Sequence, residues 1–121
     1  MLNPVIAITA GEPAGIGPDL CVMLAQQPQT ERLVVIADRQ LLAQRAQSMG
    51  LPWRSLPPNP AAQPAFEPGA LPVVHVPLAA AVTAGKLERA NAVYVLRTLE
   101  IAVDGCRDGR FDAMVTAPVH K

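Results

Sequence analysis

The stretch Thr9–Pro18, with the sequence Thr-Ala-Gly-Glu-Pro-Ala-Gly-Ile-Gly-Pro, decides how the rest of this 121-residue chain is arranged. Before it, the run Pro4–Thr9 is short, apolar and rich in β-branched residues, which is typical of a strand buried on both faces of a parallel sheet. After it, Pro18 and Asp19 predict the start of a helix. Proline is tolerated in the first turn because the N–H that it lacks would have no partner within the helix, and an acid is favoured near the positive, N-terminal end of the helix dipole. The stretch therefore predicts a strand-to-helix turn.

The next segments repeat the order of strand and then helix. Leu33–Ala37 predicts a second buried strand, and Gln40–Met49 predicts a helix that Gly50 would cap. Because parallel strands are joined by right-handed crossovers, this order predicts an α/β fold with a parallel or mixed sheet and flanking helices. The side chains expected to face the sheet are Leu20, Met23 and Leu24 in the first helix, and Leu42, Ala46 and Met49 in the second.

The middle of the chain is less regular. Leu51–Leu56 predicts a third, weaker strand. The segment Pro57–Gly69 has prolines at 57, 58, 60, 64 and 68, which exclude a helix or a strand ladder and predict a surface excursion. Leu71–Val76 resumes extended structure, and Ala84-Gly85 predicts another turn.

The longest helical pattern runs from Lys86 to Asp108, and Gly109 ends it. Phe111–Thr116 predicts the last strand, so that the following residues, Ala117–Lys121, lie just past its carboxyl end. Ligands bind at that edge in open parallel sheets. The apolar stripe of the helix is expected to form core, and it comprises Ala92, Leu96, Leu99, Val103 and Cys106.

Composition limits the classes of partner. Ten basic and ten acidic residues give a net charge of zero, which argues against capture of nucleic acid or an anionic membrane. No apolar run approaches the roughly 20 residues of a membrane span, and the N-terminus lacks the pattern of a secretory signal. Cys21 and Cys106 fall in predicted helices and suit reduced, buried thiols better than a disulfide. These features predict a cytoplasmic protein.

The glycine turn has the spacing G-x-x-x-G-x-G, which matches neither the dinucleotide fingerprint nor the phosphate loop. Pro13 and Pro18 also remove two backbone donors that a phosphate cradle would use. Glycine still lets a backbone approach a ligand closely. A turn that contacts a ligand and a purely structural turn both remain open.

Two acidic residues follow the first two predicted strands. Glu12 could accept a hydrogen bond from a ribose hydroxyl or cap the following helix. Asp38 lies about 20 residues past the glycine turn, where a dinucleotide-binding domain keeps its ribose-binding acid. Because the fingerprint is absent, a helix cap is the preferred interpretation of Asp38.

Polar residues at the end of the chain are candidates for anion binding. His120 and Lys121 follow a buried strand, and a cation beside an imidazole would suit a phosphate or carboxylate, although a polar loop end without a partner fits equally well. His75, inside an extended apolar run, is interpreted as a structural histidine. With only these two histidines and no Cys/His cluster, a complete metal site within the chain is not expected.

Two motifs near the ends of the chain carry a family resemblance. Gly11–Asp19 together with Val115–Lys121 resembles the 4-hydroxythreonine-4-phosphate dehydrogenases of pyridoxal phosphate biosynthesis. Val82–Leu87 and Asn91–Val95 are similar to that family in order and spacing. The resemblance covers the chain except the proline-rich segment.

The resemblance implies NAD- and divalent-metal-dependent oxidation of 4-phosphohydroxy-L-threonine, followed by decarboxylation to 3-amino-2-oxopropyl phosphate. It also implies a fold similar to isocitrate and isopropylmalate dehydrogenases, with two α/β domains and an active site in the cleft of a homodimer. Residues 1–121 would be a single α/β region, the N-terminal part of such an enzyme and inactive alone. The metal, zinc, magnesium or cobalt, would be bound by residues beyond this chain.

Only supporting positions can be carried over from the family. A phosphate acyltransferase-like enzyme and a non-catalytic α/β module remain alternatives. The resemblance places Gly11, Glu12, Gly15 and Gly17 near the cofactor, and Thr116, Pro118, His120 and Lys121 in the vicinity of the substrate or its phosphate.

Overall fold

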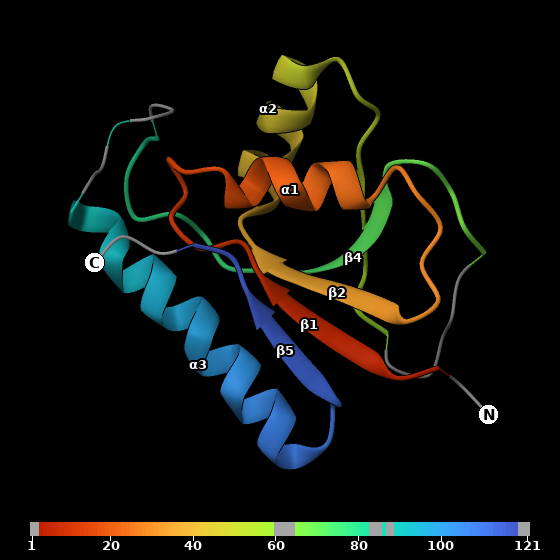
Figure 1. The fold of residues 1–121 in the computed structure, drawn as a ribbon. Coiled ribbons are helices and arrows are strands. Elements are labelled where there is room, and N and C mark those ends of the chain that lie inside the picture. The colour runs from red at the N-terminus through yellow and green to blue at the C-terminus, as the bar shows by residue number, and fades with distance from the viewer. Residues whose placement is uncertain (1–2, 60–64, 83–85, 87–88, 119–121) are drawn as a thin grey trace.

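The computed structural model describes residues 3–59, 65–82, 86 and 89–118. The predicted alternation of strands and helices is confirmed in these residues (Figure 1). The predicted turn at Ala84-Gly85 and the residues His120 and Lys121 lie outside the described part of the chain. The elements are β1 (Val5–Thr9), α1 (Gly17–Leu24), β2 (Arg32–Ala37), α2 (Arg39–Met49), β3 (Arg54–Leu56), β4 (Ala70–His75), the 3-10 turn η1 (Arg89–Asn91), α3 (Ala92–Asp108) and β5 (Ala113–Thr116).

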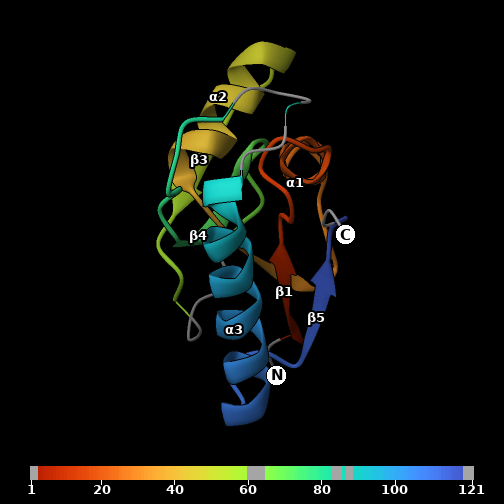
Figure 2. The same ribbon diagram turned by 90° about the vertical axis from the view of Figure 1, so that its left-hand side faces the viewer.

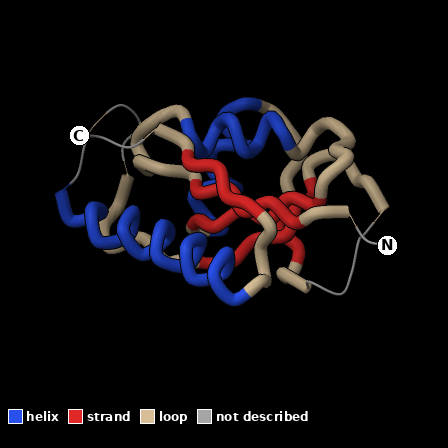
Figure 3. Tube along the Cα trace, turned by 60° about the horizontal axis from the view of Figure 1, so that its bottom comes forward, coloured by secondary structure: helices blue, strands red, loops and turns tan. Residues whose placement is uncertain are grey.

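The strands form one sheet in the order β3-β4-β2-β1-β5, and every pair of neighbours is parallel. The sheet separates α1 and α2 on one face from α3 on the other, as the tilted view shows (Figure 3). Figure 2 shows α3 running along its face of the sheet, opposite α1. The chain is therefore an α/β sandwich of three layers with a parallel sheet.

Two separate core clusters follow from the alternation of side chains along the central strands. On β1, Ile8 belongs to a cluster with Cys21 of α1 and Leu42 of α2. Its neighbour Ala7 belongs to the opposite cluster, with Tyr94 of α3. The continuous apolar runs of β1 and β2 are explained by this burial on both faces.

The predicted ends of α2 are confirmed. Both side-chain contacts of Asp38 Oδ1 are cap bonds to the backbone, from Gln40 N at 2.8 Å and Leu41 N at 3.1 Å. Gly50 closes the helix in the left-handed region, with φ of 69°. The predicted stripe of α2 is buried at Leu42 and Ala46 and half-buried at Met49.

The predicted inner face of α1 is wrong. Leu20 and Met23 are 42% and 51% exposed, and Leu24 also faces outward. Cys21 and Val22 are buried instead. The sequence from Leu20 to Ala25 is apolar all round, so its periodicity could not select a face, and packing on the sheet made the choice.

The predicted inner face of α3 is also wrong. Ala92 and Val103 are exposed, and so is Leu96, while Leu99 and Cys106 are only half-buried. The inward positions fall one or two residues away from the predicted stripe, and at one of them, Gly105, a Cβ would collide with the ring of Phe111. The helix also begins at Ala92, after η1, and not at Lys86. The buried residues of α3 are Tyr94, Thr98, Ala102 and Gly105.

The strand predictions hold with shifted ends. The third strand is limited to β3, and the last begins at Ala113, directly after Asp112, whose N–H donates to Val5 O of β1 at 2.8 Å. In the part of the chain that the structure describes, no helix is long and apolar enough to cross a membrane.

Candidate functional site at the carboxyl edge of the sheet

The two motifs from opposite ends of the chain meet at the carboxyl ends of β1 and β5. Ala117 N donates to Thr9 O at 3.0 Å, and Glu12 N donates to Pro118 O at 3.2 Å. Parallel pairing of β1 with β5 produces this meeting, since Thr9 lies opposite Thr116 in the register. The glycine turn and the segment after β5 therefore form one surface.

Two glycines of the turn are required by close packing within the chain. Gly11 has a φ of 73°, and a Cβ there would collide with Pro118 O. A Cβ on Gly17 would collide with Ala10 O and lie 2.8 Å from the Cβ of Ala117. These two glycines are thus explained by the approach of three backbone segments, whether or not a ligand binds.

Three amides of the turn donate to acceptors within the chain. Glu12 N is bonded to Pro118, Gly15 N donates to Glu12 O at 2.9 Å, and Ala14 N donates to Glu12 Oε1 at 3.2 Å. Pro13 has no amide hydrogen to donate. The amides of Glu12, Ala14 and Gly15 are therefore already used within the chain.

Glu12 caps the turn rather than the helix. Its Oε1 accepts from Ala14 N, whereas α1 has Ile16 at its N-cap and no side-chain cap bond. Its side chain is half-buried. The second oxygen of the carboxylate has no hydrogen bond among the described residues and keeps its capacity to accept one.

Arg45 of α2 is a residue of this site that sequence reasoning missed. Its guanidinium donates to the backbone oxygens of Pro13, at 2.5 Å, and Gly15, at 2.9 Å. It also pairs with Asp19 of α1 at 2.9 Å. The available signal was a charged residue three positions after Leu42, on the inward face of α2.

Asp38, at the carboxyl end of β2, makes hydrogen bonds that stabilise the fold. Its Oδ1 caps α2 and its Oδ2 accepts from Leu78 N at 2.9 Å, while its own N–H donates to the hydroxyl of Tyr94 at 3.1 Å. Both carboxylate oxygens are thus used by the backbone. The helix-cap interpretation is confirmed.

The loop after β4 is held by a second buried side chain that the sequence analysis missed. Asn91 Oδ1 accepts from Ala79 N and Ala80 N, at 3.1 and 3.0 Å. Burial of an asparagine at the end of η1 could not be seen in the helical periodicity. A cavity of about 440 Å³ lies between this loop and the start of α2, lined by Asp38, Gln40, Leu41, Gln44 and Leu78–Val82.

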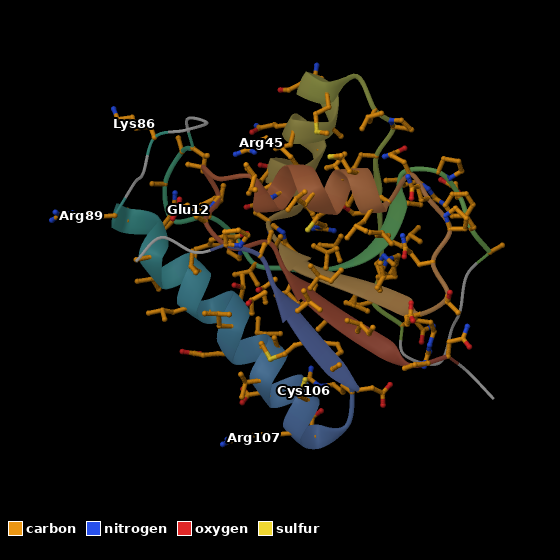
Figure 4. The ribbon with its side chains drawn as sticks, viewed as in Figure 1. Glu12, Arg45, Lys86, Arg89, Cys106 and Arg107 are labelled. Carbon is orange, nitrogen blue, oxygen red and sulfur yellow. The ribbon has the colours of Figure 1, made fainter. Side chains whose placement is uncertain are left out.

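The candidate residues for the substrate phosphate are described only in part. Thr116 and Pro118 lie at the carboxyl edge and are exposed. Lys86 and Arg89 are exposed too, and their side chains point outward beyond the start of α3 (Figure 4). His120 and Lys121, on which the phosphate prediction depended most, are not described.

The described residues contain no group of three or more His, Cys, Asp or Glu that could hold a metal. His75 Nδ1 accepts from Arg39 N at 3.1 Å, as expected for a structural histidine. Cys21 and Cys106 are free, and burial raises the pKa of the Cys21 thiol to about 12. Cys21 is therefore an inert core thiol at neutral pH.

Comparison with known proteins gives a consistent result. The 4-hydroxythreonine-4-phosphate dehydrogenases of Chromobacterium violaceum and Thioalkalivibrio sulfidiphilus are 54% and 55% identical to this sequence. Each match covers 98% of this chain and 36% of the relative, so the chain spans about a third of the length of these curated proteins.

A crystal structure of a 4-hydroxythreonine-4-phosphate dehydrogenase from Burkholderia phymatum superposes with a TM-score of 0.85 at 25% identity. It covers 100% of this chain and 38% of the solved chain. The predicted fold class, incomplete and similar to isocitrate and isopropylmalate dehydrogenases, is confirmed. Residues 29–121 match the family described as "Pyridoxal phosphate biosynthetic protein PdxA", and the chain belongs to that family.

Proposed function

We propose that the protein containing this chain is a 4-hydroxythreonine-4-phosphate dehydrogenase. It would oxidise the secondary hydroxyl of 4-phosphohydroxy-L-threonine with NAD, and the resulting β-keto acid would lose carbon dioxide to give 3-amino-2-oxopropyl phosphate. The observation that carries this proposal is the meeting of the glycine turn with Ala117 and Pro118 at the carboxyl edge of the sheet. The names of relatives at 54% and 55% identity support it.

In this proposal the turn forms a wall beside the cofactor. Gly15 presents no side chain, and the half-exposed carboxylate of Glu12 has one oxygen without a hydrogen bond among the described residues. That oxygen could accept from a ribose hydroxyl of NAD, which supplies the hydride acceptor. Gly11 and Gly17 would act indirectly, by allowing the backbone to hold this shape.

The substrate would lie toward the segment after β5. Thr116 and Pro118 are exposed there, beside the turn. We place the phosphate of the substrate in their vicinity, with His120 and Lys121 as further candidates.

The described residues do not fit the divalent metal, because they contain no cluster of ligands. We propose that zinc, magnesium or cobalt is bound by other parts of the longer, two-domain protein. A cytoplasmic homodimer acting on a small phosphorylated substrate completes the proposal. Free cysteines suit a reducing compartment, and the exposed apolar side chains of α1 and α3 are available to an interface.

The test uses the full gene product that contains this chain. We expect reduction of NAD with 4-phosphohydroxy-L-threonine and a divalent metal, and loss of that activity on chelation. Coenzyme A-dependent acyl transfer without NAD binding would contradict the proposal and favour an acyltransferase.

A variant tests the site itself. Glu12→Gln keeps an oxygen for the Ala14 amide but weakens acceptance from a ribose, so the KM for NAD should rise about tenfold with little change in kcat. The matched control is Glu100→Gln on the exposed surface of α3, where no change is expected. An unchanged KM for Glu12→Gln would remove Glu12 from the cofactor site.

A further inference from the structure

The guanidinium of Arg45 is a buried cation beneath the glycine turn. Only 11% of its side chain is exposed. The other buried residues of α2 are the apolar Leu41, Leu42 and Ala46. It donates to two carbonyl oxygens of the turn, those of Pro13 and Gly15, and to the carboxylate of Asp19. Three acceptors from two segments thus converge on one side chain.

The turn is held at two places. Its first half is bonded to the segment after β5, through Glu12 N and Pro118 O. Its second half is bonded to Arg45, which donates to the backbone oxygen of the buried Pro13. A buried carbonyl oxygen needs such a donor. Arg45 is therefore the anchor of the half of the turn that leads into α1.

Arginine suits this task better than lysine. Its planar fork presents several N–H donors in fixed directions, so that one side chain can hold carbonyl oxygens of two residues and still pair with a carboxylate. A lysine ammonium is a point charge on a flexible stem. Asp19, in the first turn of α1, pairs with the guanidinium and holds it in place beside the turn.

We propose that Arg45 is a positioning residue for NAD: it fixes the shape of the glycine turn and thereby prepares the wall against which the cofactor binds. This inference rests on the proposed function. Arg45 contacts the turn through Pro13 and Gly15, so its effect would be on the cost of ordering the turn when NAD binds. Asp19 acts in the same way, through Arg45.

The experiment compares Arg45→Lys, Arg45→Met and Asp19→Asn in the full gene product. Arg54→Met is the control, because Arg54 makes an exposed ion pair with Glu67 beside β3. For each protein the dissociation constant of NAD, the KM and kcat, the melting temperature and the amide exchange of residues 11, 12 and 14–17 are measured. The exchange reports on the turn independently of activity.

We expect Arg45→Met to weaken NAD binding about tenfold or more, with kcat at saturating NAD within about twofold of the wild type. Arg45→Lys should restore the melting temperature more than the NAD affinity. Asp19→Asn should have a smaller effect in the same direction, and Arg54→Met none. Amide exchange should accelerate in the turn and not in the core strands.

A role confined to stability would give a different pattern. If Arg45→Lys and Asp19→Asn bind NAD as the wild type does, or if exchange of the turn is unchanged, the inference is wrong. If the wild-type protein binds no NAD, the proposed function fails, and the cofactor role of Arg45 fails with it. Turn exchange would then still show whether Arg45 holds the loop.

Discussion

Gly11 and Gly50 have nearly the same backbone conformation and different surroundings. Their φ angles are 73° and 69°. A Cβ at Gly11 would collide with Pro118 O, whereas one at Gly50 has no atom within 4 Å. The pair therefore separates the cost of a left-handed conformation from the cost of crowding at the candidate site.

We predict that Gly50→Ala costs about 1–2 kcal/mol of unfolding free energy, from the left-handed conformation alone. Gly11→Ala should cost roughly 1–3 kcal/mol more, because Pro118 must also move. Urea unfolding of both variants beside the wild type measures the difference. Equal losses would show that Pro118 does not press against Gly11.

Tyr94 is a buried phenol whose oxygen accepts a hydrogen bond from Asp38 N. Burial raises its pKa from 10.0 to about 12, and outweighs the hydrogen bond from the Asp38 backbone, which lowers it. The folded state therefore keeps the phenol proton to higher pH than the unfolded state does. This contribution to stability is complete below pH 10 and is lost as pH rises toward 12.

We predict that the ultraviolet absorbance of the single tyrosine titrates near pH 12 in the folded chain and near pH 10 in urea. Between pH 10 and pH 12 the unfolding free energy of Tyr94→Phe should fall less than that of the wild type, because the phenol no longer titrates. At neutral pH the substitution should cost about 1–3 kcal/mol of unfolding free energy, because Asp38 N loses its acceptor. A folded-state midpoint near 10 would mean that the phenol is hydrated.

At the scale of elements, the helices differ in how well their sequence indicates the inner face. The stripe of α2 is bounded by polar residues, and its inward positions were predicted correctly at Leu42 and Ala46. From Leu20 to Ala25 the α1 sequence is apolar on all sides, and α3 exposes Val93, Leu96 and Val103 while it buries Tyr94. Apolar periodicity identifies a helix more reliably than it identifies the side that meets the sheet.

We predict that Leu42→Ala and Leu96→Ala differ sharply in this chain. Leu42 is fully buried at 0% exposure, so truncation should cost about 2–5 kcal/mol. Leu96 is 60% exposed, so its truncation should change stability by no more than about 0.5 kcal/mol. Chemical denaturation of the 121-residue chain gives both values. A loss above about 1 kcal/mol for Leu96→Ala would mean that a partner covers this face of α3.

At the scale of the whole molecule, the parallel sheet brings together segments that are more than a hundred residues apart. β1 lies inside the sheet, and β5 is the edge strand beside it in the order of strands. The glycine turn and the segment after β5 consequently meet at the same edge, while Arg45 reaches that edge from α2. The candidate site is therefore a product of the order of strands.

We predict that the isolated chain reduces no NAD with 4-phosphohydroxy-L-threonine and metal, while the full gene product does. The chain spans only 36% of its curated relatives, and its described residues hold no metal cluster. A sensitive assay of reduced nicotinamide on both purified proteins checks this. Metal-dependent turnover by the isolated chain would contradict the proposal that other parts of the longer protein bind the metal.

The sequence by itself determined the local features: alternating strands and helices, a parallel or mixed sheet, the caps at Asp38 and Gly50, and a glycine turn whose spacing differs from that of a phosphate loop. Each depends on residues close together in the chain, through periodicity, capping or backbone conformation. The tertiary structure alone decided which faces of α1 and α3 are buried, how Gly11 meets Pro118, and why Arg45 is buried. These depend on the order of strands and on the distance between layers, which no local pattern encodes.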